Sequence, residues 1–181
     1  TSEFMKDGQA KAVVDTGAKK TVCGAEWLRL YEGNLAARNK TLPRDARQHV
    51  EKAKKTGDLR SFQFGGGAKT SKGRVRLPCV IRPNKTERNI RITTDVVPGW
   101  MPLLFSRDAQ KYHKIFDHPL DDCLYSRELI DGKEVDMRVV NGGVDHDGIG
   151  IGVLDLLGTW CNDDTNSDSD LVLLEEMGRG W

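Results

Sequence analysis

The most informative segment of the sequence is AVVDTGAKKTVCG, residues 12–24, in which two valines lead directly into Asp15-Thr16-Gly17. Valines favour a buried strand, and Gly8-Gln9 upstream can turn the chain into it. A surface turn would account for an acid at the end of a strand. A carboxylate held there can also carry out chemistry, provided that the rest of the chain supplies the other parts of a site.

The bulk composition excludes several classes of function. The chain has 181 residues, which suits one compact domain with appendages. Lys and Arg total 28 against 27 for Asp and Glu, so we expect neither a nucleic-acid nor a membrane partner. Cysteines at positions 23, 79, 123 and 161 form no CxxC pair. We therefore expect reduced thiols in an intracellular protein, with no metal and no cofactor.

The first third of the chain combines two short strands with a helix. We expect strands at residues 10–14 and 21–23, and a helix from Ala25 to Tyr31 whose apolar residues share one face. Residues 33–60 form a basic, weakly apolar insert. Within it, Pro43 and Gly57 bracket a predicted surface helix.

The middle of the chain is rich in strand patterns. Apolar residues alternate on both sides of a glycine-rich turn, which predicts a long hairpin over residues 62–81. Residues 88–97 alternate in the same way and predict another strand. MPLLF, residues 101–105, reads as a buried strand. Ser106 then stands at the N-cap of a helix that has Asp108 in its first turn.

The remaining segments give weaker signals. Asp131-Gly132 predicts a hairpin over residues 123–140 within a C-terminal extension, residues 119–181. Residues 161–170 read as an acidic linker, and TSEF, residues 1–4, reads as a cloning scar before Met5. The pattern as a whole predicts an all-β domain, a small closed barrel with one or two short helices.

Three blocks of sequence together resemble the retropepsins, the aspartic proteases of retroviruses and retrotransposons. VVDTGA followed by Thr21-Val22 resembles their active-site loop, and FGGGAKTSKGRVRLPCVI with ERNIRITTDVV resembles their flap hairpin and the next strand. MPLLFSRDAQKYHKI resembles the segment that closes the domain, and is most similar to the gypsy-type retrotransposon versions. The blocks occur in family order and cover roughly residues 8–118.

The resemblance implies a retropepsin fold over residues 5–118 and an endopeptidase that processes a retroelement polyprotein. Asp15 would be the catalytic acid, in an active-site loop completed by Thr16, Gly17 and Ala18. The flap glycines and the residue after them would bind the peptide backbone; these are Gly65, Gly66, Gly67 and Ala68. Arg107 and Asp108 would be structural neighbours of the site, as a helix start and an ion pair.

The chain offers only one apolar-Asp-Thr-Gly segment, whereas hydrolysis of a peptide without a metal needs an acid and a base at one water. Two carboxyl groups a few ångströms apart provide both, because like charges at that distance share one proton. The second carboxyl must therefore come from Asp15 of another copy across a two-fold axis. The expected partners are a second copy of the chain and a peptide or polyprotein substrate.

Three features depart from the family pattern. The family usually has glycine where this chain has Phe105 or Ser106, and viral enzymes often have an acid at the position of Lys19. The family's first strand, part of its dimer interface, is missing if Met5 is the native start.

Other functions stay open at this point. One is a catalytically silent protein-interaction domain of the same fold, and another is a domesticated host gene product. Cys23 has no nearby base for cysteine-protease chemistry. Residues 164–175 match part of an EF-hand loop, but Ser169 stands where the turn needs glycine, so we expect a solvated linker there. The four histidines share no partner; they are His49, His113, His118 and His146.

Overall fold

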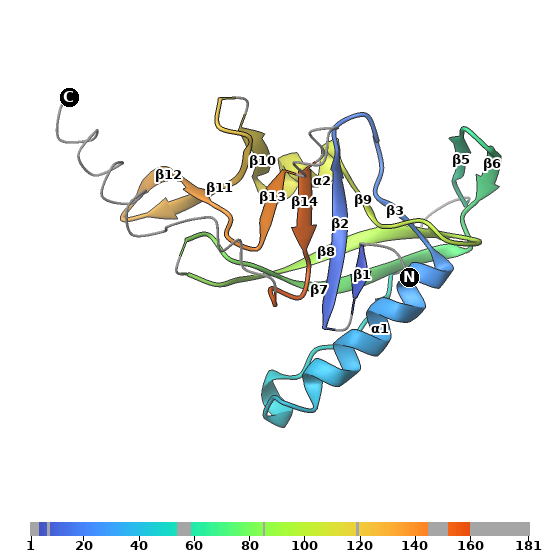
Figure 1. The fold of residues 1–181 in the computed structure, drawn as a ribbon, viewed down its shortest axis with the longest axis horizontal. Coiled ribbons are helices and arrows are strands. Elements are labelled where there is room, and N and C mark those ends of the chain that lie inside the picture. The colour runs from blue at the N-terminus through green and yellow to red at the C-terminus, as the bar shows by residue number, and fades with distance from the viewer. Residues whose placement is uncertain are drawn as a thin grey trace.

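The computed structural model describes residues 4–6, 8–53, 59–84, 86–118, 120–144 and 152–159. The described chain is mostly β, with a large mixed sheet, a three-stranded sheet and a two-stranded hairpin (Figure 1). Its first strands and helix are β1 (Met5–Lys6), β2 (Gln9–Asp15), β3 (Val22–Gly24), α1 (Ala25–Asn39), the 3-10 turn η1 (Arg44–Ala46) and β4 (Glu51–Lys52). The middle elements are β5 (Ser61–Phe64), β6 (Gly67–Thr70), β7 (Gly73–Ile81), β8 (Arg88–Val97), β9 (Leu104–Ser106) and α2 (Arg107–His113). The last strands are β10 (Ile115–His118), β11 (Cys123–Ile130), β12 (Lys133–Arg138), β13 (Gly142–Val144) and β14 (Gly152–Asp155).

The large sheet has the order β13-β14-β2-β9-β3-β8-β7-β4, with β1 pairing to the start of β2. β2 runs parallel to β9, and β3 runs parallel to β8. β9 therefore lies between β2 and β3, although those two strands are neighbours in the chain. Residues 16–21, which join them, must cross the end of β9.

Helix α1 continues past its predicted end at Tyr31 to Asn39. It does so because Leu35 extends the buried stripe begun by Trp27 and Tyr31, at a spacing of four residues. The rings of Trp27 and Tyr31 stack with their centroids 5.3 Å apart. No helix in the described residues is long and apolar enough to cross a membrane.

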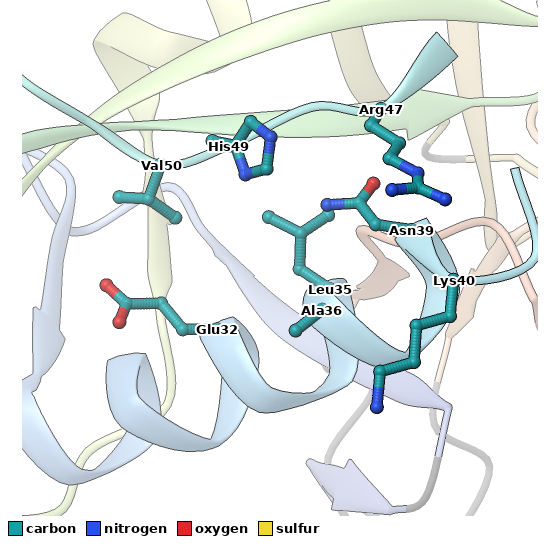
Figure 2. Close-up of a pocket in the computed structure, with 8 residues that line it drawn as sticks. All are labelled: Glu32, Leu35, Ala36, Asn39, Lys40, Arg47, His49 and Val50. Carbon is teal, nitrogen blue, oxygen red and sulfur yellow. The ribbon is translucent and has the colours of Figure 1, made fainter. Parts of the chain in front are cut away.

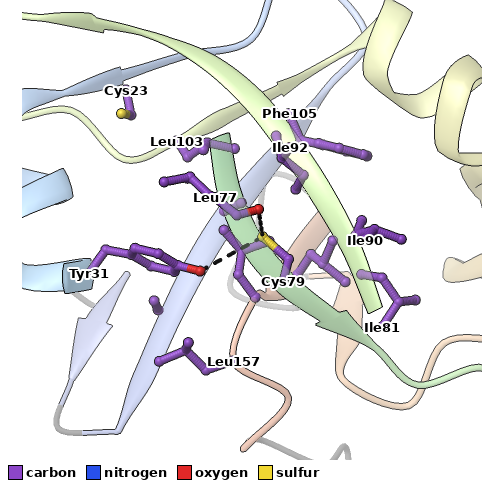
Figure 3. Close-up of a cluster of buried hydrophobic side chains, with 14 of the residues drawn as sticks. Cys23, Tyr31, Leu77, Cys79, Ile81, Ile90, Ile92, Leu103, Phe105 and Leu157 are labelled. Atoms are coloured by element: carbon purple, nitrogen blue, oxygen red, sulfur yellow. Dashed lines mark hydrogen bonds between the residues drawn. The ribbon is translucent and has the colours of Figure 1, made fainter. Parts of the chain in front are cut away.

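The core lies between α1 and the inner faces of β2, β7 and β8, as Figure 3 shows for the side chains around Tyr31. The Tyr31 hydroxyl donates a hydrogen bond to the carbonyl oxygen of Pro78 and so has a partner inside the core. Burial raises the pKa of the Cys23 and Cys79 thiols to about 12. Cys23 therefore lacks the thiolate that a cysteine nucleophile needs.

The helix predicted between Pro43 and Gly57 is not formed in the described residues. Only the single turn η1 is helical there; β4 pairs with β7, and residues 54–58 are outside the described part. Asn39 shows why, because its side-chain Nδ2 donates to the Gln48 carbonyl oxygen at 2.7 Å and its Oδ1 accepts from the Gln48 N–H at 3.2 Å. These bonds fold the segment back along α1, and a run without an apolar face has nothing to pack as a helix.

The long hairpin predicted over residues 62–81 is divided into two elements. β5 and β6 form a short hairpin around Gly65-Gly66, whereas β7 pairs along its whole length with β8. The reason is burial: the apolar side chains of β7 face those of β8, and Leu77 lies opposite Ile92 with both fully buried. Phe62 and Phe64 are only half-buried, so their strand offers β7 a less apolar partner than β8 does.

The boundary predicted at residue 118 does not separate the large sheet from the later strands. β14 pairs antiparallel with β2, and the side chains of Leu154, Leu156 and Leu157 belong to the core. The buried Asp155 carboxylate accepts the backbone N–H groups of Ala10 and Leu157, each at 3.2 Å. Residues 152–157 are therefore part of the same body as β2.

The hairpin placed at residues 123–140 by the sequence corresponds to β11 and β12. Its turn is Asp131-Gly132, with φ of 51° and 78°, which are the positive values that a tight two-residue turn requires. The acidic stretch at residues 161–170 lies outside the described residues, as does all of the proposed scar except Phe4.

The close approach at Gly24 gives a stability prediction. A Cβ on Gly24 would lie 2.4 Å from the Gly99 carbonyl oxygen and 2.5 Å from the Met101 nitrogen, both backbone atoms. Gly24→Ala should therefore destabilise the chain by about 1–3 kcal/mol. Gly33→Ala is the matched control: it lies in α1 with no atom near the added carbon, and should stabilise by about 0.5–1 kcal/mol.

Denaturant unfolding of the two variants beside the wild type measures both effects. Equal changes in unfolding free energy for Gly24→Ala and Gly33→Ala would contradict the close backbone approach.

Candidate active site

Asp15 is the last residue of β2 and pairs in register with Ser106 at the end of β9. Its side chain is half-buried, whereas Thr16 and Gly17 are exposed. The loop after Asp15 crosses β9 and enters β3, so the acid stands where two parallel strands end. This position leaves the carboxylate partly accessible to solvent.

The Asp15 carboxylate is oriented by its own loop. Its Oδ1 accepts the Gly17 N–H at 2.9 Å, and the Ala18 N–H donates to the Asp15 carbonyl oxygen at 3.3 Å. A Cβ on Gly17 would lie 3.2 Å from Asp15 Oδ1, so a glycine fits this turn best. Within the described residues no hydrogen bond reaches Oδ2. One carboxylate oxygen is thus held by backbone while the other is available to a water or a second carboxyl group.

The far end of the loop is held by the start of α2. The Arg107 N–H donates to the Ala18 carbonyl oxygen at 2.9 Å. The Thr21 hydroxyl donates to Ser106 Oγ at 2.9 Å, and the Ser106 N–H donates to Thr21 Oγ1 at 3.2 Å. Ser106 Oγ also accepts the Ala109 N–H, which confirms its place at the N-cap of α2.

Phe105 and Ser106, at one of which the resemblance would place a glycine, are both buried beside the loop. Phe105 is fully buried in the core, and its ring lies 6.1 Å from that of His113. Ser106 contributes the hydroxyl that pairs with Thr21 and caps α2. Both side chains therefore pack beside the active-site loop, and Ser106 is also bonded to it.

The charged residues around the loop take other partners than the sequence indicates. Asp108 pairs with Lys20 at 2.9 Å, and this hydrogen bond lowers the pKa of the Asp108 carboxyl. Both side chains are largely exposed, as is Lys19. Arg107 contributes its backbone N–H to the loop. Arg107 and Asp108 thus act as the predicted helix start, with Lys20 supplying the ion pair.

The β5–β6 hairpin and the loop after β2 both project from the upper side of the molecule in Figure 1, on either side of β3. The turn residues from Gly65 to Ala68 are exposed, and Gly67 has a φ of 118° that favours glycine. Lys69 Nζ donates to the Pro98 carbonyl oxygen at 3.0 Å and fastens β6 to the end of β8. No hydrogen bond within the described residues joins the hairpin glycines to Asp15.

Asp95 is the residue that the sequence analysis missed. Its carboxylate is only 2% exposed and accepts from Arg60 and Arg74, each at 3.2 Å, and from the Ser71 hydroxyl at 2.8 Å. The Ser71 N–H in turn donates to the Arg60 carbonyl oxygen, so these two residues close the base of the β5–β6 hairpin. The sequence does contain a sign of this residue: an acid stands directly before the two valines of ITTDVV.

Asp95 also connects the hairpin to the active-site loop. Its backbone N–H donates to the Thr21 carbonyl oxygen at 3.0 Å, and it lies opposite Val22 of β3. The base of the hairpin and the end of the loop are therefore fixed to one residue of β8. The two elements expected to surround a substrate share this anchor.

A hollow lies beside the C-terminal half of α1 (Figure 2). It has a volume of about 410 Å³ and lies between α1 and residues 47–50, with Leu35 and Val50 as its apolar walls. Glu32 and His49 are among the polar residues that line it. Nothing places them against a third catalytic group, and we assign this hollow no chemistry.

The described residues contain no group of three or more His, Cys, Asp or Glu side chains that could hold a metal ion. The stretch that partly matches an EF-hand, residues 164–175, lies outside them. Comparisons with protein-family models, with curated proteins and with solved structures gave no match. The geometry of the loop and of its neighbours is therefore the basis for a proposed function.

The Asp95 anchor gives a prediction about the hairpin. Asp95→Asn removes the charge from a buried group that two arginines contact, which should cost about 2–4 kcal/mol of stability and speed hydrogen–deuterium exchange in residues 61–70. Lys20→Met, which breaks an exposed pair, should change neither quantity measurably. Exchange in the hairpin that is unaltered in Asp95→Asn would contradict the anchoring role.

His113 gives a prediction about pH. Burial, helped by the nearby Arg88 charge, lowers the pKa of His113 from 6.5 to about 4. Between these values the unfolded chain takes up a proton that the folded chain does not, so the unfolding free energy falls as the pH decreases from 6.5 to 4. His113→Gln should make this fall less steep, as urea unfolding at a series of pH values would show. An identical pH dependence in the variant would contradict the buried, neutral imidazole.

Proposed function

We propose that the chain is an aspartic endopeptidase of the retropepsin type, active as a homodimer. The observation that carries the proposal is the Asp15 carboxylate, half-buried at the end of β2, with Oδ1 bound to the Gly17 N–H. Its Oδ2 has no hydrogen-bond partner within the described residues. Such a carboxylate is positioned for a second carboxyl group and a water.

The topology supports the retropepsin fold. The DTG loop joins β2 to β3 across the end of β9, and β9 leads directly into α2, which holds the loop through the Arg107 N–H. These elements come from two of the three sequence blocks that resemble the family, and the two meet at the candidate site. The third supplies β5 and β6, a glycine-rich hairpin whose base is tied to the same strand as the loop.

A homodimer would complete the chemistry. The exposed Thr16 and Gly17 leave the loop open to its counterpart in a second copy, so that two Asp15 carboxyl groups share one proton. The ionised carboxylate removes a proton from water as its oxygen attacks the peptide carbonyl. The protonated carboxyl group stabilises the oxygen that develops negative charge, and the leaving amine receives a proton.

The substrate in this proposal is an extended peptide, with a retroelement polyprotein as its source. It would lie between the active-site loop and the β5–β6 hairpin and form strand-like hydrogen bonds with exposed backbone. The glycines of the hairpin turn permit the backbone movement needed to admit the peptide and exclude water.

The proposal predicts the effect of Asp15→Asn. Because the amide cannot act as base or acid, cleavage of a denatured protein substrate at acid pH should fall by at least roughly 10³-fold. Asp45→Asn, which changes an exposed acid in η1, is the matched control and should keep full activity. Pepstatin should inhibit the wild type and the control.

Circular dichroism of each variant verifies that it is folded. Wild-type chain that cleaves nothing between pH 3 and 7, at any concentration, would contradict the proposal and favour a catalytically silent interaction domain. Equal activity in Asp15→Asn would assign any cleavage to another site.

A further inference from the structure

A basic groove borders the active-site loop between α2 and the outward faces of β7 and β8. Its volume is about 610 Å³. The positively charged side chains that line it are Lys20, Arg60, Arg74, Arg76 and Arg91, and the acidic ones are Asp95 and Asp108. A concave surface with such an excess of one charge attracts the opposite charge.

The ion pairs inside the groove do not neutralise all of its positive side chains. Asp95 is used by Arg60 and Arg74, and Asp108 by Lys20. Arg91 pairs at 2.7 Å with Glu51, but both side chains are about half exposed and can exchange partners at little cost. Arg76 lies beside Glu51 in the ladder and forms no ion pair with any described residue. Its guanidinium is available to an additional carboxylate, which arginine can bind through two hydrogen bonds.

The sequence contains an acidic segment that the proposed activity does not use. Residues 161–176 contain six Asp or Glu and no Lys or Arg, and four of these acids fall within residues 163–170. The segment lies outside the described residues. Its charge is complementary to that of the groove.

The described chain ends on the side of β7 that carries the groove. The Val80 N–H donates to the Leu156 carbonyl oxygen at 2.9 Å, and a Cβ on Gly158 would lie 3.1 Å from Val80 Cγ1. Side chains alternate along a strand, so Val80 shares its face of β7 with Arg76 and Arg74. Gly158 therefore passes over the same face that forms the floor of the groove.

The distances allow the acids to reach the arginines. Six residues of β7 separate Val80 from Arg74, about 20 Å along the strand. Arg76 is nearer, about 13 Å from Val80. An extended chain from Gly158 spans roughly 17 Å to Asp163 and roughly 40 Å to Asp170, so the acids from Asp163 onward can reach Arg76. Thr159 donates to the carbonyl oxygen of Gly8, which fixes the point from which the segment starts.

We infer that the acidic segment of residues 163–176 binds in the basic groove of its own chain, with Asp carboxylates on Arg76 and Arg91. The bound segment lies beside Thr21 and Ser106, the residues that hold the end of the active-site loop. The inference concerns binding alone and does not depend on the proposed endopeptidase activity.

The test is a competition between the tethered segment and the same segment supplied as a peptide. A fluorescent peptide of residues 162–176 is titrated into the full wild-type chain and into a neutral-segment variant. In that variant four acids become amides, namely Asp163→Asn, Asp164→Asn, Asp168→Asn and Asp170→Asn. The tethered wild-type segment occupies the groove at a high effective concentration. The peptide should therefore bind the neutral-segment variant at least ten-fold more tightly than the wild type.

The groove is tested in the neutral-segment background. Adding Arg76→Gln and Arg91→Gln should weaken peptide binding at least ten-fold, whereas Arg29→Gln, an exposed arginine of α1 outside the groove, should not. Thermal unfolding confirms that each variant is folded. Binding should also weaken as the salt concentration rises.

Three results would overturn the inference. The first is equal affinity of the peptide for the wild type and the neutral-segment variant, and the second is no binding to the neutral-segment variant at all. The third is equal weakening by Arg29→Gln and by the groove substitutions. If the difference between wild type and variant grows with the concentration of the chain, the acids come from another copy and the assignment to the same chain is wrong.

Discussion

The insertion of β9 between β2 and β3 is the constraint on which the rest of the structure depends. Because β2 pairs with β9 in parallel, Asp15 and Ser106 reach the same edge of the sheet together. The loop that leaves Asp15 then has to cross that edge to reach β3. The Ala18 carbonyl oxygen and the Thr21 hydroxyl are bound there by the first residues of α2 and the last of β9. A carboxylate in this position is oriented by backbone and still partly exposed.

Asp95 extends this arrangement to the hairpin. A buried carboxylate is stable only when its oxygens are bound, and here two arginines and a serine hydroxyl meet that requirement. The partners come from the base of the β5–β6 hairpin and from β7, whereas the Asp95 backbone binds Thr21. One residue thus sets the positions of loop and hairpin together, while the tip of the hairpin carries only exposed side chains and is left able to move.

Local patterns predicted the elements that local interactions determine. The strand before Asp15, the cap at Ser106 and the turn at Asp131-Gly132 each depend on a few neighbouring residues. The predicted elements were wrong where contacts between residues far apart in the sequence determine the structure. β7 pairs with β8 because two apolar faces match. β14 joins β2 because Leu154 and the two leucines that follow the strand complete the core. For the candidate site, the sequence placed the DTG loop at the end of a strand, and the structure has it there. Asp95 was missed because its role depends on Arg60 and Arg74, and the sequence does not show that these residues lie beside it.

The claim that the active unit needs Asp15 from two chains is tested most directly by mixed dimers. Wild-type chain at a fixed amount is unfolded and refolded together with increasing amounts of Asp15→Asn chain, and cleavage per wild-type chain is measured. With equal amounts, about half of the wild-type chains should have an inactive partner, so activity per wild-type chain should fall to about half and continue to fall with further excess. Activity per wild-type chain that is independent of the added variant would show that a single Asp15 suffices, and would contradict the account.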